Sequence, residues 1–338
     1  MNSSHVSKFF FFCLLLFLAA KSGNAQQPLR GKVICLDPGH GGTAATDTYR
    51  QGPSGEREEW VNLRVAQYLR AMLEERGAEV VMTRTRDEAV PLARRAEIAR
   101  EVNADVFLSI HHNATADSSV NFPIIYFHGN ASENQAGVAL AIALGEAFQS
   151  HIHQPETPVS VVSDHVIFAG AGAAVLRGTY GIPAVLAEAS FFTNPSEEQR
   201  LKDTAYNRRE AMAYLDALTG FFSKPVHEIY PKHSRVTQIP PFRALQEAER
   251  MNPEARRWFA DYTEGLELMK RSTADAWQRA YDCFTRSARA FPDSHVARGC
   301  HKHRAALLSK LGRKQEAAEE ALRAKEFYVT APEDTAWP

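Results

Sequence analysis

The chain lacks a charge bias of either sign. Its 338 residues include 39 Lys and Arg against 40 Asp and Glu, which leaves a formal net charge of −1. A protein whose main partner is nucleic acid carries an excess of positive charge. The balance therefore argues against nucleic acid as the main partner. The length allows two domains of ordinary size.

The chain also lacks an apolar run that fits a membrane-spanning helix. The apolar run at residues 9–20 has twelve residues, whereas a spanning helix needs about 20. Lys8 precedes this run, and Gly23-Asn24-Ala25 supplies the small residues that a signal peptidase reads. We expect residues 1–25 to be a cleaved secretory signal, with an uncleaved N-terminal anchor as the alternative. The mature chain would then be exported and have no transmembrane segment.

Cysteine is scarce, and only three remain after the predicted signal: Cys35, Cys283 and Cys300. Cys35 lies in a short apolar run and is expected to be a small apolar filler. Cys283 and Cys300 flank the turn at Phe291-Pro292-Asp293, so two antiparallel helices would bring them to similar heights. A disulfide between them is compatible with an oxidising compartment. The sequence leaves this pairing open.

Short apolar runs alternate with helical patterns over residues 32–222. Strand-like runs occupy residues 33–36, 78–83, 105–110, 122–127 and 183–187, and helical spacing occupies 56–75, 92–102, 135–150 and 197–222. Residues 151–172 are expected to form a loop with one short strand. The alternation predicts an α/β fold, with a mostly parallel twisted sheet and helices on both faces.

A second region follows residues 223–252, which are rich in Lys, His and Pro and are typical of a linker. Helical patterns then fill residues 253–328, which predicts a small all-α domain of helical hairpins, followed by a tail at 329–338. Ala280, Phe284 and Pro292 resemble the second helices of tetratricopeptide repeats, although the first-helix pattern is poor. Such a module often docks a partner protein. The alternative is a helical appendage that only packs on the first domain.

Three predicted strands end in residues that bind metals or move protons, namely His40, His111 and Glu188. Glu58 lies at the start of the helix after the first strand. The carboxyl ends of parallel strands share one edge of a sheet, so these side chains can converge there. Two histidines and a carboxylate with an open fourth position form the ligand set of a catalytic zinc site. A further carboxylate can act as a general base.

The residues around these positions resemble the zinc-dependent N-acetylmuramoyl-L-alanine amidases of the amidase type 3 family. Four motifs occur in family order: VICLDPGHGG at 33–42, EEWVNL at 58–63, SIHHNA at 109–114 and PAVLAEASFFTNPSEE at 183–198. Leu92, Arg95 and Ala99 also match the L-x-x-R-x-x-x-A helix of that family. The resemblance runs from about Lys32 to Phe222, and it implies a zinc amidase catalytic domain over residues 26–222.

The resemblance implies one zinc ion held by His40, Glu58 and His111, with Glu188 as the catalytic carboxylate. In the family, the ligand Glu precedes the Asn of an Asn-Leu pair by four residues. That spacing selects Glu58 once Asn62 is matched.

Several acids and a histidine near the motifs are expected to have roles other than binding the metal. Glu56 and Glu59 are expected to be solvated acids at the start of a helix, where the helix dipole favours negative charge. His112 stands where the resemblance implies a small residue. We expect it to lie at the rim of the site or behind the ligands, because neighbouring strand residues point to opposite faces. The alternative is that it replaces His111 as a ligand.

Two further polar residues are possible substrate contacts. Asn113 could orient neighbouring groups or substrate, or simply form a turn. Arg177 could bind a substrate carboxylate, although a structural role is preferred. The other histidines are expected to lie on the surface or to be satisfied locally: His128, His151, His153, His165, His227 and His233. His295, His301 and His303 are expected to form a solvated helical face.

The function implied by the resemblance is peptidoglycan hydrolysis. The bond would be the amide between N-acetylmuramic acid and L-alanine of the stem peptide, cut in cell-wall turnover or daughter-cell separation. The protein would then act in the periplasm or cell envelope of a bacterium, with a protein partner possible at the helical domain. The alternatives are a zinc peptidase that cuts within the stem peptide and a catalytically inactive cell-wall binding protein.

Overall fold

The computed structural model describes residues 27–46, 50–168, 171–232, 242–245, 247–250 and 252–329. The predicted signal segment, residues 330–338 and parts of the predicted linker lie outside the described residues. Within the described ranges, no helix combines the length and the apolar character that crossing a bilayer requires.

One sheet organises the described chain. Its strands are β1 (Val33–Pro38), β2 (Glu79–Met82), β3 (Val106–Asn113), β4 (Ile124–Phe127), β5 (Ser160–Ser163), β6 (Ala184–Phe191) and β7 (Tyr328–Val329). They are arranged in the order β2-β1-β3-β6-β4-β5-β7. The first four in that order are parallel, β4 and β5 run antiparallel to β6, and β7 runs antiparallel to β5. The predicted mostly parallel sheet is confirmed.

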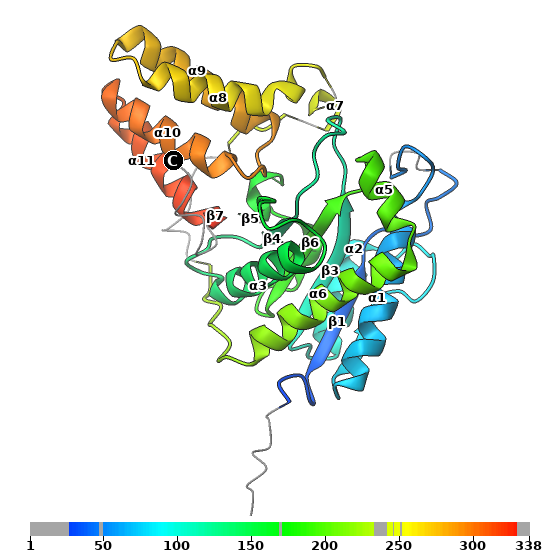
Figure 1. Cartoon of the computed structure of the whole chain (residues 1–338). Coiled ribbons are helices and arrows are strands. Elements are labelled where there is room, and N and C mark those ends of the chain that lie inside the picture. The colour runs from blue at the N-terminus through cyan, green and yellow to red at the C-terminus, as the bar shows by residue number, and fades with distance from the viewer. Residues whose placement is uncertain are drawn as a thin grey trace, which may run out of the picture.

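Helices cover both faces of this sheet, as predicted (Figure 1). They are α1 (Glu58–Glu75), α2 (Leu92–Glu101), α3 (Gln135–His151), α4 (Ala174–Gly178), α5 (Pro195–Leu201) and α6 (Thr204–Phe222), with a short 3-10 helix, η1 (Asp164–Val166). The apolar residues of α1, α3 and α6 share one core with one face of the sheet, and those of α2 and α4 pack on the other. The single helix predicted at 197–222 is two helices, because Asp203 caps a new one by accepting from the amide of Ala205.

Strand alternation explains the two cores. In β1, Ile34 and Leu36 point into the core under α1, while Cys35 between them points into the opposite core. Successive strand residues face opposite sides of a sheet. A strand that is apolar at every position is therefore one that is buried on both faces.

The C-terminal region is helical, as predicted. It contains α7 (Glu247–Arg250), a 3-10 helix η2 (Ala255–Arg257), α8 (Trp258–Met269), α9 (Ala274–Ala290), α10 (Ala297–Lys310) and α11 (Lys314–Glu326). These helices form the yellow-to-red lobe of Figure 1. After α11 the chain returns to the sheet, where Tyr328 pairs with Val162 and Val329 with Val161.

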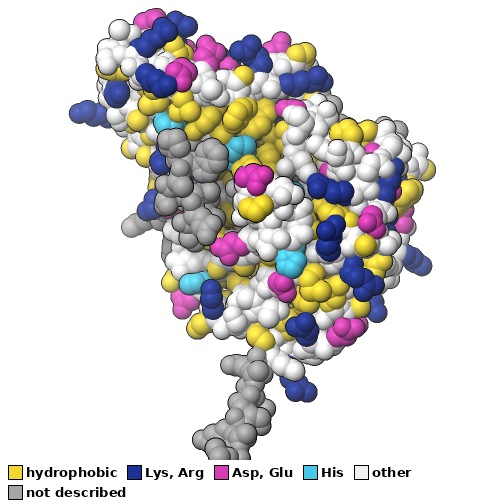
Figure 2. Space-filling model, viewed as in Figure 1, with side chains coloured by type: hydrophobic (Ala, Val, Ile, Leu, Met, Phe, Trp, Pro, Cys, Tyr) yellow, Lys and Arg dark blue, Asp and Glu magenta, His cyan; other side chains and the backbone are white. Residues whose placement is uncertain are grey.

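The helical region shares a core with the second face of the sheet. Phe291, in the turn between α9 and α10, lies 5.9 Å from the ring of Phe122 and 6.3 Å from that of Phe191. The ring centroid of Trp258 lies 5.0 Å from that of Phe291. In Figure 2, hydrophobic side chains gather where the helical lobe meets the α/β part, and charges of both signs are interspersed over the visible face. The helical region thus covers apolar surface of the sheet.

Cys283 and Cys300 are both buried free thiols. The thiol of Cys300 donates to Ser287 Oγ at 3.4 Å, and burial raises its pKa to about 12. The disulfide that the sequence left open is not formed in this structure.

Candidate metal centre

The loop after β1 brings His40 to the carboxyl edge of the sheet. Gly39 precedes it and hydrogen-bonds through its amide to the carbonyl of Ile110 at 2.9 Å. A Cβ atom on Gly39 would lie only 2.1 Å from the ring of His111, so this position excludes any side chain. His40 itself has a φ of 59°, a left-handed conformation that is uncommon for a residue with a side chain.

Two buried arginines hold this loop in place. Arg95 donates to the carbonyl of His40 at 2.6 Å and to Asp37 Oδ1 at 2.7 Å. Arg84 donates to the carbonyls of Pro38 at 2.8 Å and Gly39 at 2.9 Å. Fixed guanidinium donors of this kind satisfy carbonyls that a glycine-rich loop would otherwise leave without partners. They stabilise the strained conformation of His40.

Glu58 is the first residue of α1 and is buried. Its Oε1 accepts from the side-chain amide of Asn62 at 3.2 Å and from the backbone amide of His112 at 3.3 Å. Asn62 lies one helical turn later, on the same side of α1. The carboxylate is therefore oriented by its own helix and by β3.

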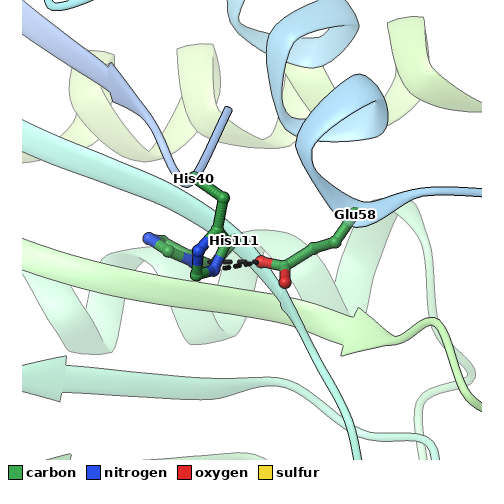
Figure 3. Close-up of side chains that lie close together, drawn as sticks. All are labelled: His40, Glu58 and His111. Atoms are coloured by element: carbon green, nitrogen blue, oxygen red, sulfur yellow. Dashed lines mark hydrogen bonds and ion pairs between the residues drawn. The ribbon is translucent and has the colours of Figure 1, made fainter. Parts of the chain in front are cut away.

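His40, Glu58 and His111 come together from three elements (Figure 3). His40 Nε2 lies 3.2 Å from Glu58 Oε1, and His111 Nδ1 lies 3.0 Å from the same oxygen. The two imidazole rings are perpendicular, with centroids 4.7 Å apart. The arrangement brings two nitrogen atoms and one oxygen atom that can act as metal ligands within reach of one ion.

The charge states of Glu58 and His111 favour the binding of a cation. Burial alone would raise the pKa of Glu58, but His40 and His111 outweigh it and hold that pKa well below its usual value. Burial lowers the pKa of His111, with Glu58 opposing the effect. Glu58 is therefore ionised and His111 tends to be neutral, and these are the forms that bind metals.

Three groups of His, Cys, Asp and Glu in the described ranges place potential ligand atoms within 4.8 Å of one another, and this is one of them. In each of the other two groups a basic side chain lies within hydrogen-bond distance of one of the donor atoms, whereas in this group Arg50 Nε lies 3.8 Å from Glu58 Oε2. Lys232 contacts the ring of His128 in the group His128, Asp164 and His165, and Arg286 donates to Asp261 at 2.8 Å in the group Asp261, Glu264 and Cys283. The donor chemistry of His40, Glu58 and His111 fits a bound metal ion best.

Glu188 lies beside this group. It is the register partner of His111 across the β3–β6 ladder, so the two side chains lie on the same face of the sheet. Its Oε2 is buried and has no hydrogen-bond partner among the described residues. Burial, followed by the charges of Glu58 and Asp293, raises the pKa of Glu188 well above its usual value. A carboxylate in this environment has a high affinity for a proton.

His112 points to the other face of β3, as the alternation predicts. Its Nδ1 lies 2.8 Å from Asn62 Oδ1, and its Nε2 lies 3.1 Å from Glu210 Oε2 on α6. Burial alone would lower the pKa of His112, but Glu210 raises it above its usual value. The histidine therefore connects Glu210 to Asn62, which in turn orients Glu58.

The two possible substrate contacts have local partners. The side chain of Asn113 accepts from the amide of Ala114 at 2.8 Å, so it closes the end of β3. Arg177 donates to the carbonyls of Ala171 and Gly172, both at 2.9 Å. It lies on α4, before β6, and therefore at the edge of the sheet opposite to Glu188 and His111.

Three predicted solvent-exposed side chains are buried or nearly so. Glu59 is fully buried and accepts from Arg57 Nε at 2.7 Å, while Glu56 accepts from Arg64 at 2.6 Å and is mostly covered. His301 is also fully buried, with Nδ1 at 2.6 Å from Glu320. The prediction of solvated side chains at these positions was wrong, because each meets a charged partner close by. It was also wrong for His295, whose ring packs against Phe122 and Trp258.

The sequence reasoning missed three charged residues around the site. Arg84 follows β2, Arg50 lies in the loop before α1, and Asp293 lies in the turn between α9 and α10. Asp293 raises the pKa of Glu188 and hydrogen-bonds to the hydroxyl of Tyr126. No motif includes these residues. Only the proximity of their elements in the folded chain brings them to the site.

The family model described as N-acetylmuramoyl-L-alanine amidase (Amidase_3) matches residues 34–220. The chain belongs to this family. The match contains His40, Glu58, His111 and Glu188 and ends before the C-terminal helical region.

The chain is similar to the probable cell wall amidases LytH of Staphylococcus epidermidis and Staphylococcus aureus. The identity is 31% over 216 residues for the first and 31% over 218 residues for the second. Each match covers 62% of this chain and 64% of the relative. The chain thus spans a little under two thirds of the length of these relatives.

Among solved structures, the chain is similar to the N-acetylmuramoyl-L-alanine amidase AmiC2 of Nostoc punctiforme, with a TM-score of 0.50 and 28% identity. It is also similar to the CwlD amidase of Clostridioides difficile, solved in complex with the GerS lipoprotein, with a TM-score of 0.50 and 25% identity. The matches cover 57% of this chain, but 98% and 99% of those chains.

Proposed function

We propose that this protein is a zinc-dependent N-acetylmuramoyl-L-alanine amidase that hydrolyses the amide between N-acetylmuramic acid and L-alanine of the peptidoglycan stem peptide. The observation that carries the proposal is the convergence of His40, Glu58 and His111 beside Glu188, whose buried Oε2 has no hydrogen-bond partner in the part of the chain that the structure describes. Membership in the amidase family supports the choice of bond.

The proposed roles follow from the chemistry of the side chains. His40, Glu58 and His111 would hold the zinc ion, which when bound supplies Lewis-acid activation of water and of the scissile carbonyl. Glu188 would accept a proton from the attacking water and pass it to the departing amine nitrogen, because its raised pKa favours holding that proton between the two steps. Asn62 and His112 would keep Glu58 oriented.

The remaining parts of the proposal concern location and domains. We place the catalytic domain at residues 26–222, followed by the linker at 223–252 and the helical region at 253–328. Export to the periplasm or cell envelope is part of the proposal, since the relatives are named as cell wall amidases. A protein partner on the helical region remains a prediction.

The test is digestion of purified peptidoglycan by the zinc-loaded chain, followed by mass analysis of the released products. We expect free stem peptides that begin with L-alanine, and we expect their loss after chelation and in Glu188→Gln. This variant keeps the size of the side chain but cannot accept the proton. Glu146→Gln makes the same substitution at an exposed position of α3, away from the site, so it serves as the matched control and should retain activity.

Other outcomes of the digestion would favour a different function or contradict the role proposed for Glu188. Cuts within the stem peptide would favour a zinc peptidase. Binding to peptidoglycan without any release of peptide would favour the inactive binding protein. Activity that survives in Glu188→Gln would contradict the role proposed for Glu188.

A further inference from the structure

The loop that leads into α1 is held firmly against α5. Glu198 accepts from the amide of Ser54 at 2.9 and 2.8 Å, from the Ser54 hydroxyl at 2.6 Å and from the amide of Glu56 at 3.0 Å. A Cβ atom on Gly52 would lie 2.5 Å from Glu198 Oε1, so glycine is needed there for the carboxylate to fit beneath the loop. The backbone at residues 50–57 is therefore preorganised.

This loop presents Arg50 to the candidate metal centre. The carbonyl of Arg50 accepts from the amide of Glu58 at 3.2 Å, which ties its backbone to the first turn of α1. Its Nε lies 3.8 Å from Glu58 Oε2, and about a third of its side chain is exposed at 32%. Arg50 also lowers the pKa of Glu188 against the effect of burial, so its charge reaches both acids of the site.

A peptide that carries carboxylates meets mainly acidic side chains at this site. Glu58 and Asp293 are buried and Glu188 is partly buried, and all three are acidic side chains near the point of reaction. Like charges repel strongly where water is excluded, so a further cation beside the proposed metal ion favours the binding of an anionic peptide. The planar guanidinium of arginine matches a carboxylate with two parallel hydrogen bonds.

We infer that Arg50 binds a carboxylate of the stem peptide close to the scissile amide and so selects acidic over amidated stems. The inference rests on the proposed amidase function and adds a specificity residue to it. One residue of extended chain spans about 3.5 Å, so a carboxylate on the residue after L-alanine is within reach of a group beside Glu58. Once a cation is bound, Glu58 shares its charge with that cation, which leaves Arg50 better able to attract an incoming anion.

The experiment compares two muramoyl-peptide substrates that differ at one group. One carries a free carboxylate on the residue after L-alanine, and the other carries a carboxamide there. The full zinc-loaded chain is expected to prefer the carboxylate. In Arg50→Gln we expect kcat/KM for the carboxylate substrate to fall about tenfold to a hundredfold, mainly through KM. For the carboxamide substrate it should change by less than about threefold.

Two further variants separate a specific contact from a general effect of charge. Arg50→Lys keeps the charge but not the planar fork, so it should recover part of the preference. Arg86→Gln removes a positive charge from an exposed neighbouring loop and should leave the preference unchanged. Zinc content should equal that of the parent in all three variants.

An equal loss on both substrates in Arg50→Gln, or a loss of zinc, would overturn the inference. Failure of the parent to cut either substrate would instead count against the proposed function. In that case, equilibrium binding of the two peptides decides the question for Arg50. A preference for the carboxylate peptide that is lost in Arg50→Gln supports the inference, and equal binding of both peptides overturns it.

Discussion

At the scale of single residues, His295 shows how burial changes the behaviour of an ordinary side chain. Its ring lies 5.0 Å from Phe122 and 5.6 Å from Trp258, between the sheet and the helical region. Its Nδ1 is buried and has no hydrogen-bond partner among the described residues. Burial lowers the pKa of this histidine to about 4. Between about pH 4 and about pH 6.5, the folded protein therefore holds a neutral imidazole where the unfolded chain would hold a charged one.

This difference makes stability depend on pH. The imidazole of an unfolded chain protonates near pH ~6.5, while the folded one protonates near pH 4. Between these values only the unfolded chain binds the proton, so the free energy of unfolding decreases as the pH falls from about 6.5 to about 4. The loss from this one residue is on the order of 2 to 3 kcal/mol.

We expect His295→Phe, which keeps an aromatic ring but cannot be protonated, to lose less stability than the parent between pH 7 and pH 4.5. Urea unfolding at the two pH values measures the difference. His227→Phe is the matched control, because His227 is exposed and its replacement should leave the pH dependence unchanged. A His295→Phe protein with the same pH dependence as the parent would show that His295 does not carry the effect.

The sequence could point to residues whose role follows from their place in a strand or helix. His40 and His111 follow or end strands, and Glu58 begins a helix, so a simple rule about sheet edges brings them together. Arg84 and Arg50 could not be found that way, because their site contacts include backbone carbonyls and a carboxylate supplied by other elements. Such partners are defined only by the folded chain.

At the scale of elements, the helical region is joined to the sheet by more than a linker. Ser160 Oγ donates to the carbonyl of Asp293 at 2.7 Å, and Tyr328 donates to that of Pro292 at 2.9 Å. The hydroxyl of Tyr126 hydrogen-bonds to the Asp293 carboxylate. Together with the pairing of β5 and β7, these bonds fix the turn between α9 and α10 against the sheet.

Removal of residues 223–338 should therefore destabilise the α/β part. The deletion exposes Phe122, Tyr126 and Phe191, and each large side chain that loses its cover costs about 1.5 to 3 kcal/mol. The sum is comparable with the 5 to 15 kcal/mol by which a typical domain is stable. We expect poor soluble yield and a lower urea midpoint than that of a chain lacking only residues 330–338. An unchanged midpoint would show instead that the helical region is a detachable module.

The elements themselves were predictable where the pattern is local. The helix α9 lies in the region predicted to be helical, because its apolar stripe and its N-cap Thr273 are both in the sequence. The strand β7 was not predicted, since two residues contain no period and its partner β5 lies far away in the chain. The break before α6 was missed for a different reason: the helical pattern continues through Lys202 and Asp203.

At the scale of the whole molecule, the candidate metal centre connects elements that are far apart in the chain. His40 follows β1, Glu58 begins α1 and His111 lies in β3. An ion that binds these three residues only when the chain is folded stabilises the fold by RT ln(1 + [L]/Kd), or about 4 kcal/mol at a thousandfold excess over Kd. Metal affinity should therefore appear as a shift in thermal stability.

We expect zinc to raise the Tm of the chelator-treated protein and to have little effect on Gly39→Ala. A Cβ atom at position 39 would lie 2.1 Å from the His111 ring, so the ring must move away from its partners. Gly220→Ala is the control, because a Cβ atom there meets nothing within 4 Å and alanine favours the helix. It should show the full zinc-dependent rise. An equal rise in both variants would mean that zinc binds without His111, since only the change at position 39 reaches that ring.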